Sequence, residues 1–284
     1  LCAVRFAGET PEDDAREVVL GELGLERGDV VDRRALGDGL RAAQAALREE
    51  GWLEASLGPV EVSDDARGAT VDIRAHIGPR YEIVLRGHAP ITRDTIASAL
   101  GLRTERLTGS VGERGLRDRV VDLYLRHGFL DARVEVRREN AAPGHARLVI
   151  VVTPGAQLDV VGIGFPGATH FDTDFLRDQV VSYLEEDVDG STLVYPVDSE
   201  TADDLGAGGR SVLRPREIPE PLVVEPARVY YAPTYTEAIR HIEELYEADG
   251  FLGARVGPER VERLASGEIA VVVPVVEGPQ TRLH

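Results

Sequence analysis

The amino-acid sequence predicts an α+β fold built from three tandem copies of one unit, each with the order strand, helix, helix, strand, strand. Two observations carry this prediction: a nine-residue pattern that occurs three times, and a matching alternation of helix-like and strand-like segments around each occurrence. The length of 284 residues agrees with it, because such a chain is long enough for two to three small domains.

The nine-residue pattern consists of a large apolar residue, three mostly polar residues, Gly, an aromatic residue, Leu, one free position and Ala. It occupies residues 47–55, 124–132 and 246–254. Its most restricted members are Gly51, Trp52 and Ala55, then Gly128, Phe129 and Ala132, and finally Gly250, Phe251 and Ala254. Equivalent placement in three copies predicts that the aromatic side chains pack in the cores of the units.

Each unit opens with a short strand, a glycine and a first helix. The expected strands lie at residues 4–6, 81–85 and 158–161, and the glycines that follow them are Gly8, Gly87 and Gly167. Side chains suited to cap a helix N-terminus come next, at Thr10, Thr92 and Asp172.

Apolar residues three and four positions apart predict a second helix in each unit. The three stripes are Leu36, Leu40, Ala43 and Leu47; Leu116, Val120 and Tyr124; and Tyr235, Ile239, Ile242 and Tyr246. We expect each of these helices to end at the glycine of the pattern, because glycine readily adopts the positive φ that stops a helix.

Two strand-like runs joined by a turn-rich stretch follow each alanine of the pattern. They are expected at residues 60–62 and 71–73, at 134–136 and 148–152, and at Val256 and 269–273. A pair of Gly and Pro ends each hairpin. These pairs place the repeats at residues 1–79, 80–157 and 158–280, with residues 281–284 as the start of a further repeat.

The third copy is longer than the others by about 40 residues, which lie between its two helices at about 187–227. This insertion is acidic, rich in Gly and Pro, and has no sustained apolar period. We therefore expect a long loop, in which only residues 222–224 have the composition of a short strand. We expect residues 189–221 to be at least partly mobile and dispensable for folding.

The element order and the pattern together resemble the POTRA (polypeptide-transport-associated) repeat. The resemblance is carried best by Tyr124, Gly128, Phe129, Ala132 and Val134 in the second copy, and by Tyr246, Gly250, Phe251, Ala254 and Val256 in the third. It covers essentially the whole chain. The first copy departs from it with Leu47 in place of Tyr and Trp52 in place of Phe.

This resemblance implies both a fold and a function. The fold is a three-stranded mixed sheet covered by two antiparallel helices, in which the returning strand of the hairpin is central and the leading strand is an edge.

Three copies look like the BamA or TamA type of outer-membrane protein assembly factor. The resemblance then implies a periplasmic arm, without catalysis or cofactor, that precedes a membrane β-barrel. Its partners would be unfolded barrel precursors, accessory lipoproteins and that barrel. Two-partner secretion and chloroplast-type transporters are alternatives.

Composition restricts other functions. The net charge of −18 argues against binding to nucleic acid or anionic lipid, which both need clustered cations. Cys2, the single cysteine, cannot form an internal disulfide; we interpret it as a small residue of the first strand, with a lipid-anchor site as the alternative. Since the chain contains no Met, we expect Leu1 to follow residues that are not part of this sequence.

Two short motifs suggest other chemistry. Gly162, Gly164 and Gly167 match the G-x-G-x-x-G fingerprint, so a nucleotide-binding enzyme domain is the main alternative. The other two copies lack this fingerprint, and the following helix leads into another helix rather than a strand, which disfavours it. The segment 187–191 resembles the start of a calcium loop but lacks its later acidic positions, so we interpret it as a solvated helix end.

The candidate partner-binding site is the leading strand of the second hairpin. An edge strand offers unpaired backbone groups to which an extended peptide can add. The first and third copies carry Gly58-Pro59 and Gly257-Pro258 in this strand, which removes a donor. The second copy runs through Arg133, Val134, Glu135, Val136 and Arg137 without interruption. We therefore predict that this strand is the preferred site of strand addition.

Overall fold

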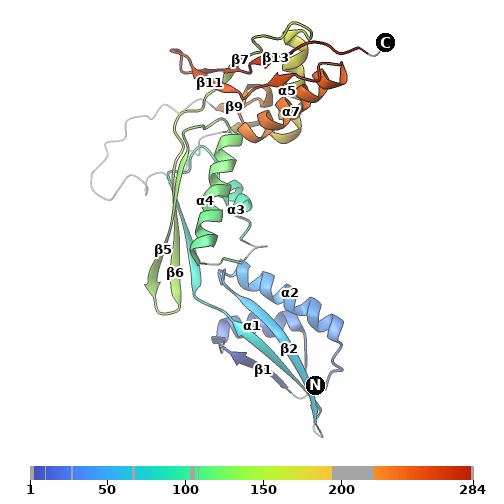
Figure 1. Ribbon diagram of the computed structural model, residues 1–284. Helices are drawn as coiled ribbons and strands as arrows, with labels where there is room; N and C mark the ends of the chain where they lie inside the picture. The colour runs from blue at the N-terminus through green and yellow to red at the C-terminus, as the bar shows by residue number, and fades with distance from the viewer. Residues whose placement is uncertain are drawn as a thin grey trace, which may run out of the picture. The chain divides into compact units, whose positions relative to one another are not determined.

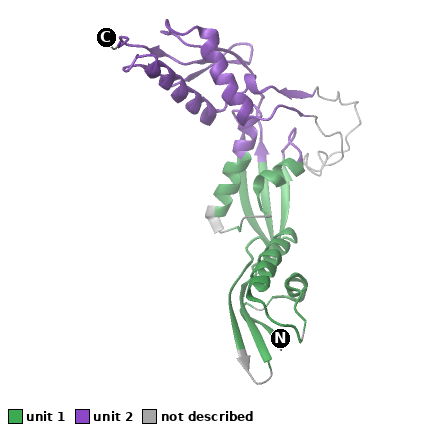
Figure 2. Cartoon of the chain, turned by 90° about the vertical axis from the view of Figure 1, so that its right-hand side faces the viewer, with its two compact units in different colours: residues 1–86, 93–120, 134–151 green, residues 87–92, 121–133, 152–284 purple. Residues whose placement is uncertain are grey.

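The computed structural model describes residues 3–9, 11–26, 28–65, 68–102, 106–107, 109–193 and 221–282 (Figure 1). It divides into two compact units (Figure 2). The first unit holds residues 1–86, 93–120 and 134–151, and the second holds residues 87–92, 121–133 and 152–284. This division runs through the second predicted repeat, whose helix α4 (Gly109–Arg126) contributes residues to both units.

The first repeat has the predicted order of elements. They are β1 (Ala3–Gly8), α1 (Asp13–Leu23), α2 (Arg33–Glu49), β2 (Ser56–Asp65) and β3 (Gly68–His76). The returning strand β3 is central, because it pairs in parallel with β1 and antiparallel with β2. The predicted stripe of α2 is buried and shares one core with Val71 and Ile73 of β3.

The second repeat follows the same plan. Its elements are β4 (Arg80–Arg86), α3 (Arg93–Leu100), α4, β5 (Arg133–Ala142) and β6 (His145–Thr153). The strand order is β4-β6-β5, with β4 and β6 parallel, so the returning strand β6 is again central. Tyr124, the last member of the predicted stripe, is buried and meets the ring of Phe129 edge-on at 5.7 Å between centroids.

The third repeat has the same order of main elements as the first two, with additional short elements. Its first part comprises β7 (Val160–Gly164), α5 (Thr173–Asp187), β8 (Ser191–Leu193), β9 (Leu222–Val224), the 3₁₀ helix η1 (Pro226–Arg228) and α7 (Ala232–Ala248). The hairpin region comprises β10 (Arg255–Val256), β11 (Arg260–Arg263), β12 (Ile269–Val272) and β13 (Val275–Val276). The main sheet has the order β11-β12-β7, so the returning strand is central here too.

The glycines and aromatics of the nine-residue pattern have the predicted roles. Gly51, Gly128 and Gly250 follow their helices with φ of 101°, 83° and 90°. Trp52, Phe129 and Phe251 are all buried. The pattern therefore ends each second helix and turns an aromatic ring back into the core.

The starts of the first helices agree with prediction in two of three copies. Asp172 caps α5, since its carboxylate accepts the N–H of Asp174 at 2.8 Å. Helix α3 begins directly after Thr92. Helix α1, however, begins at Asp13, with Glu12 in the cap position. Thr10, which we expected to be the cap, lies outside the described residues.

The expected long loop in the third repeat is wrong at its start, where residues 191–193 form β8. The short strand expected at residues 222–224 is confirmed as β9. Strands β8 and β9 pair antiparallel, with Leu193 opposite Leu222. Val188, Val224 and Val229 are buried in the core of the third repeat, so both ends of the insertion belong to the fold. Their apolar contacts involve residues distant in sequence, which a local period does not reveal. Residues 194–220, the rest of the segment expected to be mobile, lie outside the described residues.

Among the helices that the structure describes, none combines the length and the hydropathy that a membrane span requires.

Candidate partner-binding edge and repeat junctions

Strand β5, the candidate partner-binding strand, lies at the end of its sheet. It runs for ten residues, and its side chains alternate at first: Val134 is buried and Val136 half-buried, whereas Arg133, Glu135 and Arg137 are exposed. No other described strand pairs with its outer side. With respect to the described strands, β5 therefore offers one unpaired row of backbone donors and acceptors.

The equivalent edges of the first and third repeats are interrupted where the Gly-Pro pairs fall. In β2, the register against β3 shifts between Leu57 and Val60. In the third repeat the leading strand is split at Gly257-Pro258. Its first part, β10, pairs with β13, and its second part, β11, pairs with β12. Neither edge is continuous, so β5 is the longest uninterrupted leading strand of the three.

The glycines of the G-x-G-x-x-G match do not form a phosphate-binding turn. Gly162 and Gly164 lie within β7 and align with Ala270 and Val272 of β12. Gly167 turns the chain at φ 94°, where an added Cβ would lie 2.1 Å from the carbonyl oxygen of Val275. Helix α5 begins only at Thr173, so its N-terminal N–H groups do not follow the glycines directly.

The segment that resembles a calcium loop has a different role. Asp187 accepts hydrogen bonds from Thr234 and from Arg126, so its carboxylate is used within the protein. Within the part of the chain that the structure describes, no three His, Asp, Glu or Cys side chains are grouped to hold a metal ion.

A pair of hydrogen bonds recurs where each repeat passes to the next. The carbonyl of the pattern glycine accepts an N–H from a residue about 30 positions later. The three bonds are Tyr81 to Gly51 at 2.8 Å, Leu158 to Gly128 at 2.9 Å, and Thr281 to Gly250 at 2.8 Å. The preceding side chain also donates to the carbonyl before that glycine: Arg80 to Glu50 at 2.7 Å, Gln157 to His127 at 3.2 Å, and Gln280 to Asp249 at 2.9 Å. We name these two bonds the junction pair.

An acidic residue at the free position of the pattern adds an ion pair in two copies. Glu54 binds Arg138 of β5 at 2.7 Å and accepts the hydroxyl of Tyr81 at 2.6 Å. Burial and this hydrogen bond raise the pKa of Tyr81. Asp131 binds both guanidinium nitrogens of Arg263, on β11, at 2.8 and 2.9 Å, which lowers the pKa of its carboxyl group. In both cases the arginine comes from the hairpin of the following repeat.

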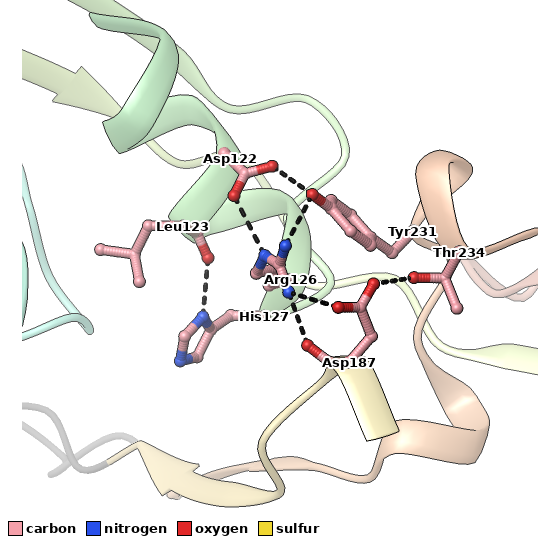
Figure 3. A network of polar contacts seen from close by, with 7 residues as sticks. All are labelled: Asp122, Leu123, Arg126, His127, Asp187, Tyr231 and Thr234. Carbon is pink, nitrogen blue, oxygen red and sulfur yellow. Dashed lines mark hydrogen bonds and ion pairs between the residues drawn. The ribbon is translucent and has the colours of Figure 1, made fainter. Parts of the chain in front are cut away.

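Arg126, near the end of α4, is the centre of a larger polar network in the second unit (Figure 3). Its Nε binds Asp122 at 3.0 Å, and its Nη2 donates to the hydroxyl of Tyr231 at 3.0 Å. Its Nη1 donates to the carbonyl of Asp187 at 2.5 Å. The guanidinium carbon also lies 4.4 Å from the centre of the Tyr231 ring. The hydrogen bond from Thr234 and the charge of Arg126 lower the pKa of Asp187.

Gln157 extends this network to the insertion. Besides His127, its side-chain amide contacts the carbonyl of Val223, in β9, at 3.1 Å. The paired ends of the insertion are therefore held to the end of the second repeat through Gln157 and Arg126.

The sequence predicted β5 as the candidate partner-binding strand, and this stays a prediction; it did not predict the junction residues. One available signal was the free position of the pattern, which is acidic in the first two copies (Glu54 and Asp131) and Gly253 in the third. A second signal was the polar residue directly before each opening strand. The partners Arg138 and Arg263 gave no signal, because they do not occupy equivalent positions relative to the pattern.

No protein-family model matches the sequence, and no curated protein matches it either. Among solved structures, the chain is similar to POTRA3-5 of BamA from Haemophilus influenzae, with 15% identity, a TM-score of 0.35, and coverage of 97% of this chain and 95% of that chain. The N-terminal domain of Omp85 from the cyanobacterium Thermosynechococcus elongatus has 14% identity, a TM-score of 0.31, and coverage of 97% and 95%. CdiB from Escherichia coli has 14% identity and a TM-score of 0.25, over 97% of this chain and 37% of that chain.

Proposed function

We propose that this chain is the periplasmic POTRA arm of an outer-membrane β-barrel assembly or translocation protein, and that it acts as a scaffold without catalysis. The support is internal. The strand-helix-helix-strand-strand order and the Gly-aromatic-Leu-x-Ala pattern occur in each repeat, and each three-stranded sheet has its returning strand in the centre. In this role the arm binds unfolded barrel precursors and accessory lipoproteins.

The observation that carries the binding proposal is the uninterrupted edge of β5. Strand addition uses backbone hydrogen bonds, so it accepts many sequences that share only an extended conformation. This suits precursors that have little in common besides alternating strands. The exposed Arg133, Glu135 and Arg137 limit permanent pairing between two copies of the arm, because charged side chains on an edge disfavour edge-to-edge association.

The test uses proline at two neighbouring positions of β5. In a strand, successive N–H groups point to opposite sides, so one of Glu135→Pro and Val136→Pro removes an outward donor and the other removes a donor to β6. The variant that leaves thermal unfolding unchanged has lost only the outward donor. We expect that variant to lose crosslinking between β5 and an extended barrel-derived peptide that carries a photoreactive residue.

Matched substitutions in β2 serve as the control. Glu61→Pro and Val62→Pro make the same change in an interrupted edge, and we expect the crosslinking yield to be unaffected. Crosslinks that map mainly to β2 or to β10 and β11, or that persist in the outward β5 variant, would overturn the assignment of the site.

A further inference from the structure

The leucine of the nine-residue pattern has a different environment in each copy. Leu53 is 2% exposed and Leu252 is 63% exposed, although both follow the aromatic residue of the pattern directly. Leu130 is partly buried and packs against the core of the third repeat. The leucine is therefore not needed in the core of its own repeat.

Leu53 is covered by residues of the second repeat. Its carbonyl accepts the N–H of Leu107 at 2.9 Å, and Leu53 lines a cleft together with Ala97 of α3 and Leu102, two residues beyond the end of that helix. In the first two copies, then, the repeat that follows in the chain covers the leucine, fully for Leu53 and partly for Leu130.

The third copy already has the other features of a junction. The junction pair is present, with Thr281 bonded to Gly250 and Gln280 bonded to Asp249. The backbone thus leaves the third repeat as it leaves the first two. What differs is the exposed leucine and the free position, where Gly253 replaces an acid.

We propose that Leu252, with the carbonyl groups of Asp249 and Gly250, forms a docking surface for one further strand-helix-helix-strand-strand unit whose first strand begins at Thr281. This unit docks through apolar contact with Leu252, without the acid–arginine pair of the other junctions, because Gly253 has no carboxylate to offer. The same nine residues then have two functions: the aromatic and the alanine complete one repeat, and the leucine and the two carbonyls receive the next. This inference does not depend on whether β5 binds precursors.

The test measures whether position 252 becomes covered. In a Cys2→Ser background, Leu53→Cys and Leu252→Cys are introduced separately and labelled with a maleimide. In the 284-residue chain we expect Leu252→Cys to react at least about tenfold faster than Leu53→Cys, since reaction of a buried thiol requires local opening. A second copy of residues 81–157 is then fused after Gln280, so that its Tyr81 replaces Thr281. Labelling of Leu252→Cys should slow by at least about tenfold in this extended chain.

A second substitution separates docking from simple crowding. Gly253→Glu restores the acid, and an added Cβ at this position meets no atom within 4 Å. In the extended chain it should slow labelling several-fold further, and Arg138→Ala in the added unit should cancel that effect. In the 284-residue chain Gly253→Glu should leave the labelling rate unchanged.

Two results would overturn the proposal. One is fast labelling of Leu252→Cys in the extended chain although hydrogen exchange shows that the strands of the added unit are protected. The other is self-association of the 284-residue chain that Leu252→Asp abolishes in analytical ultracentrifugation, because a second copy of the chain would then be the occupant of this surface.

Discussion

Arg126 binds Asp187 twice, through the backbone carbonyl at 2.5 Å and through the carboxylate at 3.4 Å. The two residues stand at or near the ends of two helices, α4 and α5, that belong to successive repeats. Asp187 is also the residue at which the insertion begins, and its carboxylate accepts the hydroxyl of Thr234, where α7 has begun. One guanidinium group thereby holds both ends of the insertion to the preceding repeat.

Arg126→Ala should destabilise the second unit by about 1–3 kcal/mol, because it removes charge-assisted hydrogen bonds from partly buried partners. Chemical unfolding followed by far-UV circular dichroism measures this loss of stability. Arg240→Ala is the matched control, since Arg240 makes an exposed pair with Glu244 on α7 and should cost less than about 0.5 kcal/mol. Equal unfolding of both variants would mean that the Arg126 network contributes no more than a surface ion pair.

Phe129→Ala should destabilise the second repeat by about 3–5 kcal/mol, because the ring is buried and its removal leaves a cavity beside Tyr124. The measurement is the free energy of unfolding by denaturant. Phe175→Ala removes an aromatic residue that is 41% exposed on α5, and we expect a change within about 1 kcal/mol. A Phe129 variant as stable as the parent would instead indicate that the ring serves binding.

Replacing residues 194–221 by a two-residue Asn-Gly turn should leave the fold of the third repeat intact. Leu193 and Leu222 are cross-strand partners, so a tight turn joins β8 directly to β9. A longer deletion that also removes β8 and β9 should destabilise the repeat, because it uncovers Val188 and takes away Val224. Thermal unfolding of the two deletion variants distinguishes them, and the opposite order of stability would contradict the role assigned to the β8–β9 pair.

Glu277 should make the third repeat sensitive to acid. Burial opposes its ionisation, but the N–H of His170 and both donors of Thr169 together lower the pKa of its carboxyl group to about 2, from an ordinary value of 4.5. A lowered pKa in the folded state means that the carboxylate stabilises the fold above about pH 4.5, and that this stability is lost as the pH falls towards 2.

Unfolding of the parent and of Glu277→Gln between pH 2 and 6 tests this expectation. The parent should lose more stability than the variant as the pH decreases, so that the difference between them narrows in acid. Glu237→Gln, an exposed position on α7, is the control and should follow the parent. If the difference in stability between the parent and Glu277→Gln is constant with pH, the charge of Glu277 does not stabilise the third repeat.

The repeat plan could be predicted from sequence because its signals are local. The stripe of Leu36, Leu40 and Leu47 is buried as its spacing requires, and the positive φ of Gly128 follows from its place after a helix. The interruptions of the edge strands at Pro59 and Pro258 could also be predicted from the sequence, because proline has no backbone N–H to donate.

The tertiary structure alone decided how the repeats are joined and what becomes of the insertion. Arg126 and Asp187 are 61 positions apart, and Asp131 and Arg263 are 132 apart. No period or motif relates such residues, because their contact depends on which faces of two successive repeats meet. The same holds for the pairing of β8 with β9, although the sequence did indicate a short strand at residues 222–224. Both strands are short and become stable through pairing and through the burial of Val188 and Val224 in a core formed by distant segments. Local pattern determined the elements of each repeat, and long-range packing determined the connections between them.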